Sequence, residues 1–343
     1  MKARLLRPSM VVTLLTLAGS LSGSFASAAP THVVRRGGAV RTAAASASAV
    51  SYSVEVPVVT RVVGTALFRT AIDISNNTAT GTTASPVLAR LQYSYTRVNG
   101  DGTTSFFRTP NPTSPAGQPM NIRLLAFDNF HTDDFVQYLA TLPGILQPGA
   151  DQSSFGTLLV TFESLPSSQG WEGTVFARTY SPNPTGAGTV AIAYPASLFF
   201  ESANMTLVAT IRDTQTAPSA ALVAGRLRTN IGVRNTDIRG TTLPVTVQLA
   251  FYDVTPGNLT NGQRVGAVLT LPNLQPGEVR QINNIRAAAA IPDNVTGMLA
   301  FADVVGANAS TPTIEGYVNI LDGDTQDGAF FEMKCADTDG CGT

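Results

Sequence analysis

Apolar and polar side chains alternate along several short stretches that begin after residue 51. Between residues 68 and 75, Phe68, Ile72 and Ile74 fall on one face of an extended chain, and Arg69 and Asp73 fall on the other. A period of two predicts strands that bury one face. The run at 99–102, Asn-Gly-Asp-Gly, separates two such stretches and favours a hairpin, because these residues accept positive φ.

The same pattern returns in the second part of the chain, which indicates an internal repeat. FRTAIDISN at 68–76 matches LRTNIGVRN at 227–235. Three shorter matches keep the same order along the chain: 91–93 with 247–249, 156–158 with 297–299, and 172–173 with 315–316. Two facing antiparallel sheets are the usual way to bury several short strands. The repeat therefore predicts an all-β protein with two β-sandwich domains, at 51–200 and 203–334.

One helical segment is expected in each copy. In the first copy, residues 133–140 have helical character, Thr132 is placed to cap the N-terminus, and Pro143 and Gly144 end the segment. The second copy has a shorter segment at 287–291, closed by Pro292. A short helix that crosses between two sheets accounts for both segments.

The N-terminus has the three parts of a secretory signal. Lys2, Arg4 and Arg7 precede an apolar run, and Ala26-Ser27-Ala28 forms a small-residue cleavage site. We expect residues 1–28 to be removed after Ala28, 29–50 to be a flexible leader, and 335–343 to be a C-terminal tail. No later apolar stretch is long enough to span a membrane. The sequence thus predicts a secreted protein, extracellular or at the cell surface, without a transmembrane anchor in the mature chain.

Composition agrees with a turn-rich β protein. Charged residues make up 13% of the chain, and there are 30 glycines and 21 prolines. The formal charge of −1 becomes −4 when the three basic residues of the signal are removed. A mildly acidic chain has no electrostatic reason to bind nucleic acid or an anionic membrane.

The chain resembles a family of secreted bacterial proteins of uncharacterised role that are built from tandem immunoglobulin-like β-sandwich repeats. The residues that carry the resemblance are the two repeat openings and three further stretches. These are VPVVTRVVG at 56–64, LQPGEVRQINNI at 274–285 and GYVNILDGDTQDGAFF at 316–331. The resemblance implies two tandem immunoglobulin-like sandwiches and export, and it implies no active site.

Catalytic motifs are absent from the mature sequence. His131 precedes Asp133 and Asp134, a pattern that is typical of a solvated loop histidine beside helix-capping acids. Glu172 and Glu315 occupy matching places in the two copies, which favours a structural role in each copy over a carboxylate pair for hydrolysis. We therefore expect no enzyme activity, no catalytic residue and no bound cofactor.

Two features near the C-terminus offer binding or cross-linking chemistry. Asp322, Asp324 and Asp327 lie on a glycine-containing segment, here called the acidic turn (322–328). It is expected to be a plain hairpin turn, with a calcium site as the alternative, since carboxylate oxygens are calcium ligands. Cys335 and Cys341 are expected to form a disulfide in an exported protein, with an intermolecular bond or free thiols as the alternatives.

These observations predict a secreted, non-catalytic structural or interaction protein. The alternatives are a glycan-binding module, and a secreted hydrolase that uses a carboxylate pair. A glycan platform would draw on aromatic residues, and the longer inserts of the first copy, 108–119 and 143–154, would hold a partner site. The expected partner is an extracellular protein or a glycan. The aromatic candidates are Phe106, Phe107, Trp171, Tyr180, Phe199 and Phe200.

Overall fold

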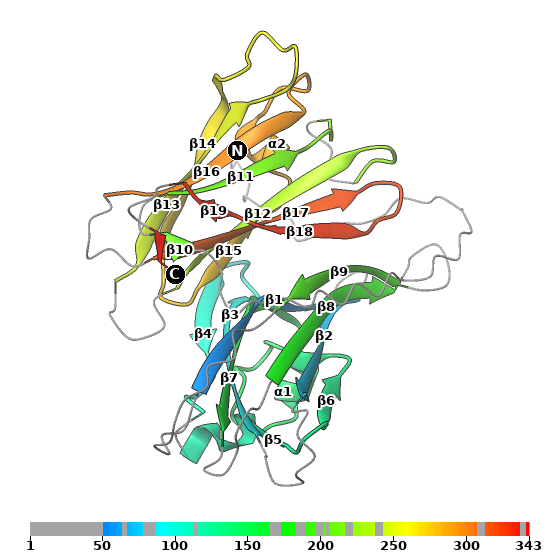
Figure 1. Cartoon of the computed structure of the whole chain (residues 1–343), viewed down its shortest axis with the longest axis vertical. Helices are drawn as coiled ribbons and strands as arrows, with labels where there is room; N and C mark the ends of the chain where they lie inside the picture. Colours follow the sequence, from blue (N-terminus) through cyan, green and yellow to red (C-terminus); the bar gives the residue numbers. More distant parts are fainter. Residues whose placement is uncertain are drawn as a thin grey trace, which may run out of the picture.

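The computed structural model contains many β-strands and two short α-helices, so the protein is all-β (Figure 1). The structure describes residues 51–63, 67–77, 87–112, 115–164, 173–182, 189–196, 202–203, 206–216, 222–236, 243–306, 313–336 and 341–342. The signal and leader predicted for 1–50 lie outside these residues.

The first half of the chain, strands β1 to β9, forms one antiparallel sheet with the order β4-β3-β7-β1-β2-β8-β9. In addition, β5 pairs with β3, and β6 pairs with β2. The strands are β1 (Ser51–Val63), β2 (Leu67–Asn76), β3 (Val87–Val98), β4 (Thr104–Arg108), β5 (Asn121–Leu124), β6 (Asn129–Thr132), β7 (Ser153–Ser164), β8 (Gly173–Pro182) and β9 (Thr189–Pro195), with a 3-10 helix at Pro115–Met120.

The second half, strands β10 to β20, forms two antiparallel sheets. One has the order β15-β12-β17-β10-β20, with β18 also paired to β17, and the other has the order β14-β13-β16-β11-β19. The strands are β10 (Ser202–Ala203), β11 (Thr206–Arg212), β12 (Leu227–Asn235), β13 (Val245–Asp253), β14 (Arg264–Leu274), β15 (Val279–Ile282), β16 (Gly297–Val304), β17 (Ile314–Asp322), β18 (Gly328–Glu332), β19 (Lys334–Cys335) and β20 (Cys341–Gly342).

The two halves repeat one pairing scheme. In the first half, β6-β2-β8-β9 and β4-β3-β7-β1 are the two runs of the sheet, and they meet where β1 pairs with the start of β2. In the second half, β15-β12-β17-β18 and β14-β13-β16-β11 follow in the same order. The registers agree as well. Asp73 in β2 pairs with His131 in β6 and with Phe176 in β8. Its counterpart Gly232 in β12 pairs in the same way with Gln281 in β15 and with Tyr317 in β17.

Each half buries its own apolar core, and the alternation in the sequence identifies the inward side chains. Ile72 and Ile74 in β2 are fully buried, as are their counterparts Ile231 and Val233 in β12. The hairpin at 99–102 is confirmed, with the Asn99 amide donating to the carbonyl of Thr103 at 2.7 Å.

One of the short repeat matches is out of phase. Leu158 is fully buried, whereas the residue matched to it, Leu299, is only partly buried and its neighbour Met298 points inward. The match of 172–173 with 315–316 is also displaced, because Gly173 pairs with Asn76 in β2 and Gly316 pairs two positions earlier in β12. Short glycine-containing matches thus do not fix strand register.

Both expected helices are present, with shifted boundaries. Helix α1 (Phe135–Ala140) begins two residues later than expected, because Asp134, and not Thr132, accepts a hydrogen bond from the Gln137 amide at 3.0 Å. Helix α2 (Ile285–Ala289) begins two residues earlier than expected and is capped by Asn284. Each helix follows a strand of one run (β6 or β15) and precedes a strand of the other (β7 or β16). In the second half the two runs are separate sheets, as expected for a crossover, whereas in the first half they belong to one sheet.

Candidate functional site

The two halves of the chain meet in an interface that contains charged and aromatic side chains. Figure 1 shows β12, β17 and β18 of the second half lying against the end of the first half where β1, β8 and β9 come together. The core of the first half extends into this interface, because Val279 and Tyr317 of the second half belong to the same cluster of buried side chains.

The charged part of the interface consists of one arginine and two glutamates. Arg234 in β12 forms ion pairs with Glu55 in β1 of the other half and with Glu315 in β17, the latter at 3.4 Å. The Arg234 side chain is 5% exposed, and the glutamates are 10% and 17% exposed. In addition, Arg234 Nε is buried without a hydrogen-bond partner among the described residues. The cluster carries a formal excess of one negative charge.

Burial in the interface changes the ionisation of Glu315. Burial, which disfavours the charged carboxylate, raises the pKa of Glu315 to about 7. Arg234 opposes this change, and the nearby carboxylate of Glu332 adds to it. Burial also lowers the pKa of Arg234. Glu315 is therefore able to exchange a proton near neutral pH.

The hollow beside this cluster is narrow. It is lined by Pro57 and Thr157 of the first half and by Val279 and Tyr317 of the second, in addition to the charged residues, and its size is close to that of one water molecule. Most glycosidases use two carboxylates with different pKa values, but glycoside hydrolysis needs space for a sugar between the two carboxylates.

Aromatic contacts form the second part of the interface. The ring of Phe330 packs edge-on against Tyr194 of the first half, with centroids 5.5 Å apart, and stacks on Tyr317 at 5.6 Å. The Asn319 amide donates to the Tyr194 hydroxyl at 3.2 Å. Burial raises the pKa of Tyr194 and that of Tyr317, so both hydroxyls stay neutral at physiological pH.

A tight turn of the second half forms the third contact. The turn at 275–278 lies over the first half, and Arg108 donates from Nη2 to the carbonyl of Pro276 at 2.6 Å. Gly277 has a φ of +75°, and a Cβ atom there would lie 2.7 Å from Arg108 Nη2. The backbone conformation therefore favours glycine at this position, and a side chain there would displace the end of the Arg108 side chain.

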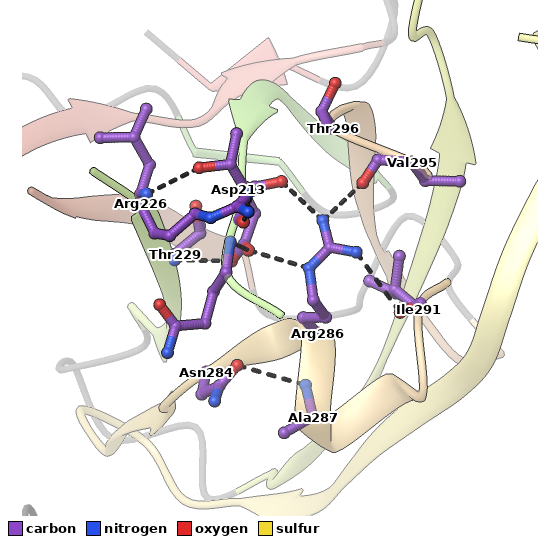
Figure 2. Close-up of polar contacts among 12 residues, drawn as sticks. Asp213, Arg226, Thr229, Asn284, Arg286, Ala287, Ile291, Val295 and Thr296 are labelled. Carbon is purple, nitrogen blue, oxygen red and sulfur yellow. Dashed lines mark hydrogen bonds and ion pairs between the residues drawn. The ribbon is translucent and has the colours of Figure 1, made fainter. Parts of the chain in front are cut away.

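A second buried ion pair lies inside the second half (Figure 2). Arg286 in α2 and Asp213 just after β11 have fully buried side chains, and Arg286 Nε lies 3.0 Å from Asp213 Oδ1. The guanidinium also donates to the backbone carbonyls of Asp213, Ile291 and Val295. Burial raises the pKa of Asp213, although the Thr229 amide and Arg286 oppose this change. The pair ties helix α2 to the sheet.

The first half holds its helix in the same way with the charges exchanged. There the arginine is on the strand, since Arg61 in β1 pairs through Nε with Asp134, the residue that caps α1, at 2.8 Å. In the second half the acid follows β11 and the arginine is on the helix. Because of this exchange, the repeat in the sequence does not reveal the shared ion pair.

His131 lies in β6 and not in a loop, which corrects the expectation from the sequence. Its Nδ1 is 2.8 Å from Asp73, its Nε2 is 3.3 Å from Asp133, and the side chain is 51% exposed. The hydrogen bond to Asp73 raises the pKa of His131. Among the described residues, no three His, Cys, Asp or Glu side chains come together in a way that could hold a metal ion.

The three carboxylates of the acidic turn each accept backbone hydrogen bonds. Asp322 accepts from the Asp324 amide at 2.7 Å, Asp324 from the Gly225 amide at 2.7 Å, and Asp327 from the Ala191 amide of the first half at 3.2 Å. The turn thereby joins β9 to β18, and the calcium alternative stays a prediction.

The other candidates from the sequence are scattered. Cys335 lies in β19 beside β11, and Cys341 lies in β20 beside β10; their disulfide stays a prediction, because the Cys341 side chain lies outside the description. Trp171, Glu172, Phe199 and Phe200 lie outside the described residues. Phe107 packs on Tyr95 at 5.7 Å and lies under Arg97, so it does not form an open aromatic platform.

Glu55, Arg234, Asp213 and Arg286 were not singled out in the sequence. A weak signal existed for Arg286, because it stands alone in the apolar run from Ile285 to Ile291. The sequence matches no protein-family model, no curated protein and no solved structure. None of the described helices has the length and apolar character needed to cross a membrane.

Proposed function

We propose that the protein is a secreted, non-catalytic structural or interaction protein of the extracellular space or cell surface. Its two halves are tandem immunoglobulin-like β-sandwiches held in one fixed arrangement. The observation that carries this proposal is the interface around Arg234, in which a buried charge of the second half pairs with a glutamate of the first. The resemblance to secreted bacterial repeat proteins supports the same proposal.

The physical argument concerns orientation. A buried ion pair contributes little net stability, because desolvation offsets the attraction, but a misaligned pair leaves charges buried without partners. In the observed arrangement of the halves, Arg234 pairs with Glu55 while Tyr194 and Phe330 also pack together. The interface thus favours a rigid spacer that presents the loops at its ends, which suits recognition at a surface.

Two features weigh against a hydrolase or a glycan-binding module. The hollow beside Glu55 and Glu315 has room for about one water molecule, and Arg234 lies between the two carboxylates. Phe106 and Phe107 are only partly exposed, and Phe107 is covered by Arg97. The first feature supports a structural role for the carboxylate pair, and the second leaves Phe106 and Phe107 without the open ring faces that a glycan platform needs.

The test uses the secreted chain after signal removal and the Arg234→Ala variant. Small-angle X-ray scattering of the wild-type chain should match a single rigid arrangement of the halves, and Arg234→Ala should increase the maximum dimension and the spread of orientations. In parallel, a panel of glycoside, ester and peptide substrates should show no turnover. Turnover that Glu315→Gln or Glu55→Gln abolishes would overturn the proposal, as would a flexible wild-type chain or retention of the protein in the cytoplasm.

A further inference from the structure

The repeat of one pairing scheme allows the surfaces of the two halves to be compared position by position. The row Gln281–Gly232–Tyr317 across β15, β12 and β17 corresponds to the row His131–Asp73–Phe176 across β6, β2 and β8. Both rows lie on the side of the strands that points away from the core of their own half, since Ile72 and Ile231 beside them point inward.

The two faces differ in burial. In the second half, Tyr317 is 3% exposed and Asn319 is 2% exposed, because the first half covers them. In the first half, Phe176 is 50% exposed and Arg178 is also exposed. The surface that the second half uses to bind a β-sheet unit is therefore open at the corresponding place in the first half.

The tight turns at the ends of these faces show the same contrast. In the turns at 125–128 and 275–278, the third residue is Phe127 or Gly277. Its backbone amide donates to the backbone carbonyl of Asn76 or Asn235, respectively. Gly277 is packed on the other half, whereas Phe127 has a φ of +66° and is 71% exposed. Bulky residues are rare in this backbone conformation, and such strained residues cluster at functional sites.

The part of the chain that the structure describes does not offer a second place for the same mode of docking. The second half docks beside β1 of the first half, through Glu55. The counterpart of β1 is β11. The edge of β11 that corresponds to the docking edge of β1 is already paired with β19. A second copy therefore has to meet the exposed face of β6, β2 and β8, here called the open face, in another way. The charges of the open face indicate how.

The open face is complementary to itself. Asp73 and Arg178 lie at opposite corners of a square of neighbouring positions whose other corners are Phe176 and Ala71. Suppose that a two-fold axis relates two copies and runs between their facing surfaces along the diagonal from Phe176 to Ala71. Phe176 of one copy then lies against Phe176 of the other, and Asp73 of each copy lies opposite Arg178 of the other. The strands of the two copies then cross at roughly a right angle, one of the two common modes of sheet packing.

We propose that the β6-β2-β8 face of the first half binds the same face of a second copy, forming a two-fold symmetric dimer. Phe176 supplies the apolar centre, and Asp73 of each copy pairs with Arg178 of the other. Within one chain, Asp73 also accepts from His131, and Arg178 donates to Thr189 and lies over Tyr180. These contacts hold both charged groups in place on the face before the copies meet.

Sedimentation velocity on the mature chain tests the proposal over concentrations up to about 100 μM, which detects a dimer of moderate affinity. We expect a reversible dimer that Phe176→Asp weakens at least about tenfold, the effect of losing about 1.4 kcal/mol of binding free energy. Phe331→Asp is the matched control, because Phe331 is 48% exposed on the other half and should leave the dimer unchanged.

A charge exchange provides a second test that does not depend on the apolar centre. Asp73→Arg and Arg178→Asp should each weaken the dimer, because like charges then face each other, and the double variant should regain part of the lost affinity. Circular dichroism establishes that each variant is folded. A chain that stays monomeric over the whole concentration range overturns the proposal, as does a dimer indifferent to both Phe176→Asp and the charge exchange. Binding of a different protein at Phe176 by a monomeric chain would likewise overturn it.

Discussion

Replacing Glu315 with glutamine should change the pH dependence of stability. The folded-state pKa of Glu315 is about 7, against an ordinary value of 4.5, because burial and the nearby carboxylate of Glu332 outweigh the opposing effect of Arg234. The folded state therefore binds a proton more tightly than the unfolded state. The contribution of Glu315 to stability is highest at low pH, falls as the pH rises above 4.5, and stops falling above about 7.

The size of the effect follows from the shift. The difference between the ordinary pKa of 4.5 and the folded-state pKa of about 7 corresponds to about 3 kcal/mol between the two limits, and most of this falls between pH 5 and pH 8. Glu315→Gln removes the titrating group but keeps the shape of the side chain. Relative to the wild type, the variant should thus be stabilised by about 2 kcal/mol more at pH 8 than at pH 5.

Urea unfolding followed by circular dichroism at pH 5, 6, 7 and 8 measures the difference directly. Glu163→Gln is the matched control, because Glu163 pairs with Arg90 away from the interface and is 29% exposed. Its free energy of unfolding should run parallel to that of the wild type. If the wild type and Glu315→Gln also give parallel curves, Glu315 is not buried in a charged interface and the reasoning is refuted.

Four further predictions follow from single features. Arg286→Ala should destabilise the protein by about 3–5 kcal/mol in urea unfolding, because it leaves Asp213 buried without its counter-ion, and the double variant with Asp213→Ala should lose less than the sum of the single losses. Phe127→Gly should raise the melting temperature, since the backbone there has positive φ; a lower temperature would show that the ring contributes packing. Replacing Cys335 and Cys341 with serine should barely change the melting temperature, because their loop is short, and a large decrease would identify the tail as a clamp. Adding calcium or EDTA should leave the melting temperature unchanged, because backbone amides already occupy the carboxylates of the acidic turn; a stabilisation that rises with calcium concentration would establish the ion site.

Much of the local structure could be predicted from the sequence. The alternation at 68–75, the hairpin at 99–102 and the two helical segments depend on neighbours within a few residues, and each is present in the structure. The differences concern the exact positions of caps and registers. Thr132 and Asp134 are both good capping residues, and only the path of the chain decides which carboxyl or hydroxyl group reaches the helix amides. The short glycine-containing matches also failed to predict strand register, because one residue more or less in a strand reverses the direction of its side chains.

The sequence by itself determined the β-rich character, the internal repeat and the places of the turns, because each depends on residues close together in the chain. The tertiary structure alone decided which charges are buried. Arg234 meets Glu55 from the other half, and Asp213 meets Arg286 from a distant helix. No periodicity marks such pairs, since their ionisation and packing depend on groups brought together only when the sheets assemble, and in the two halves the arginine and the aspartate of the helix ion pair have changed places.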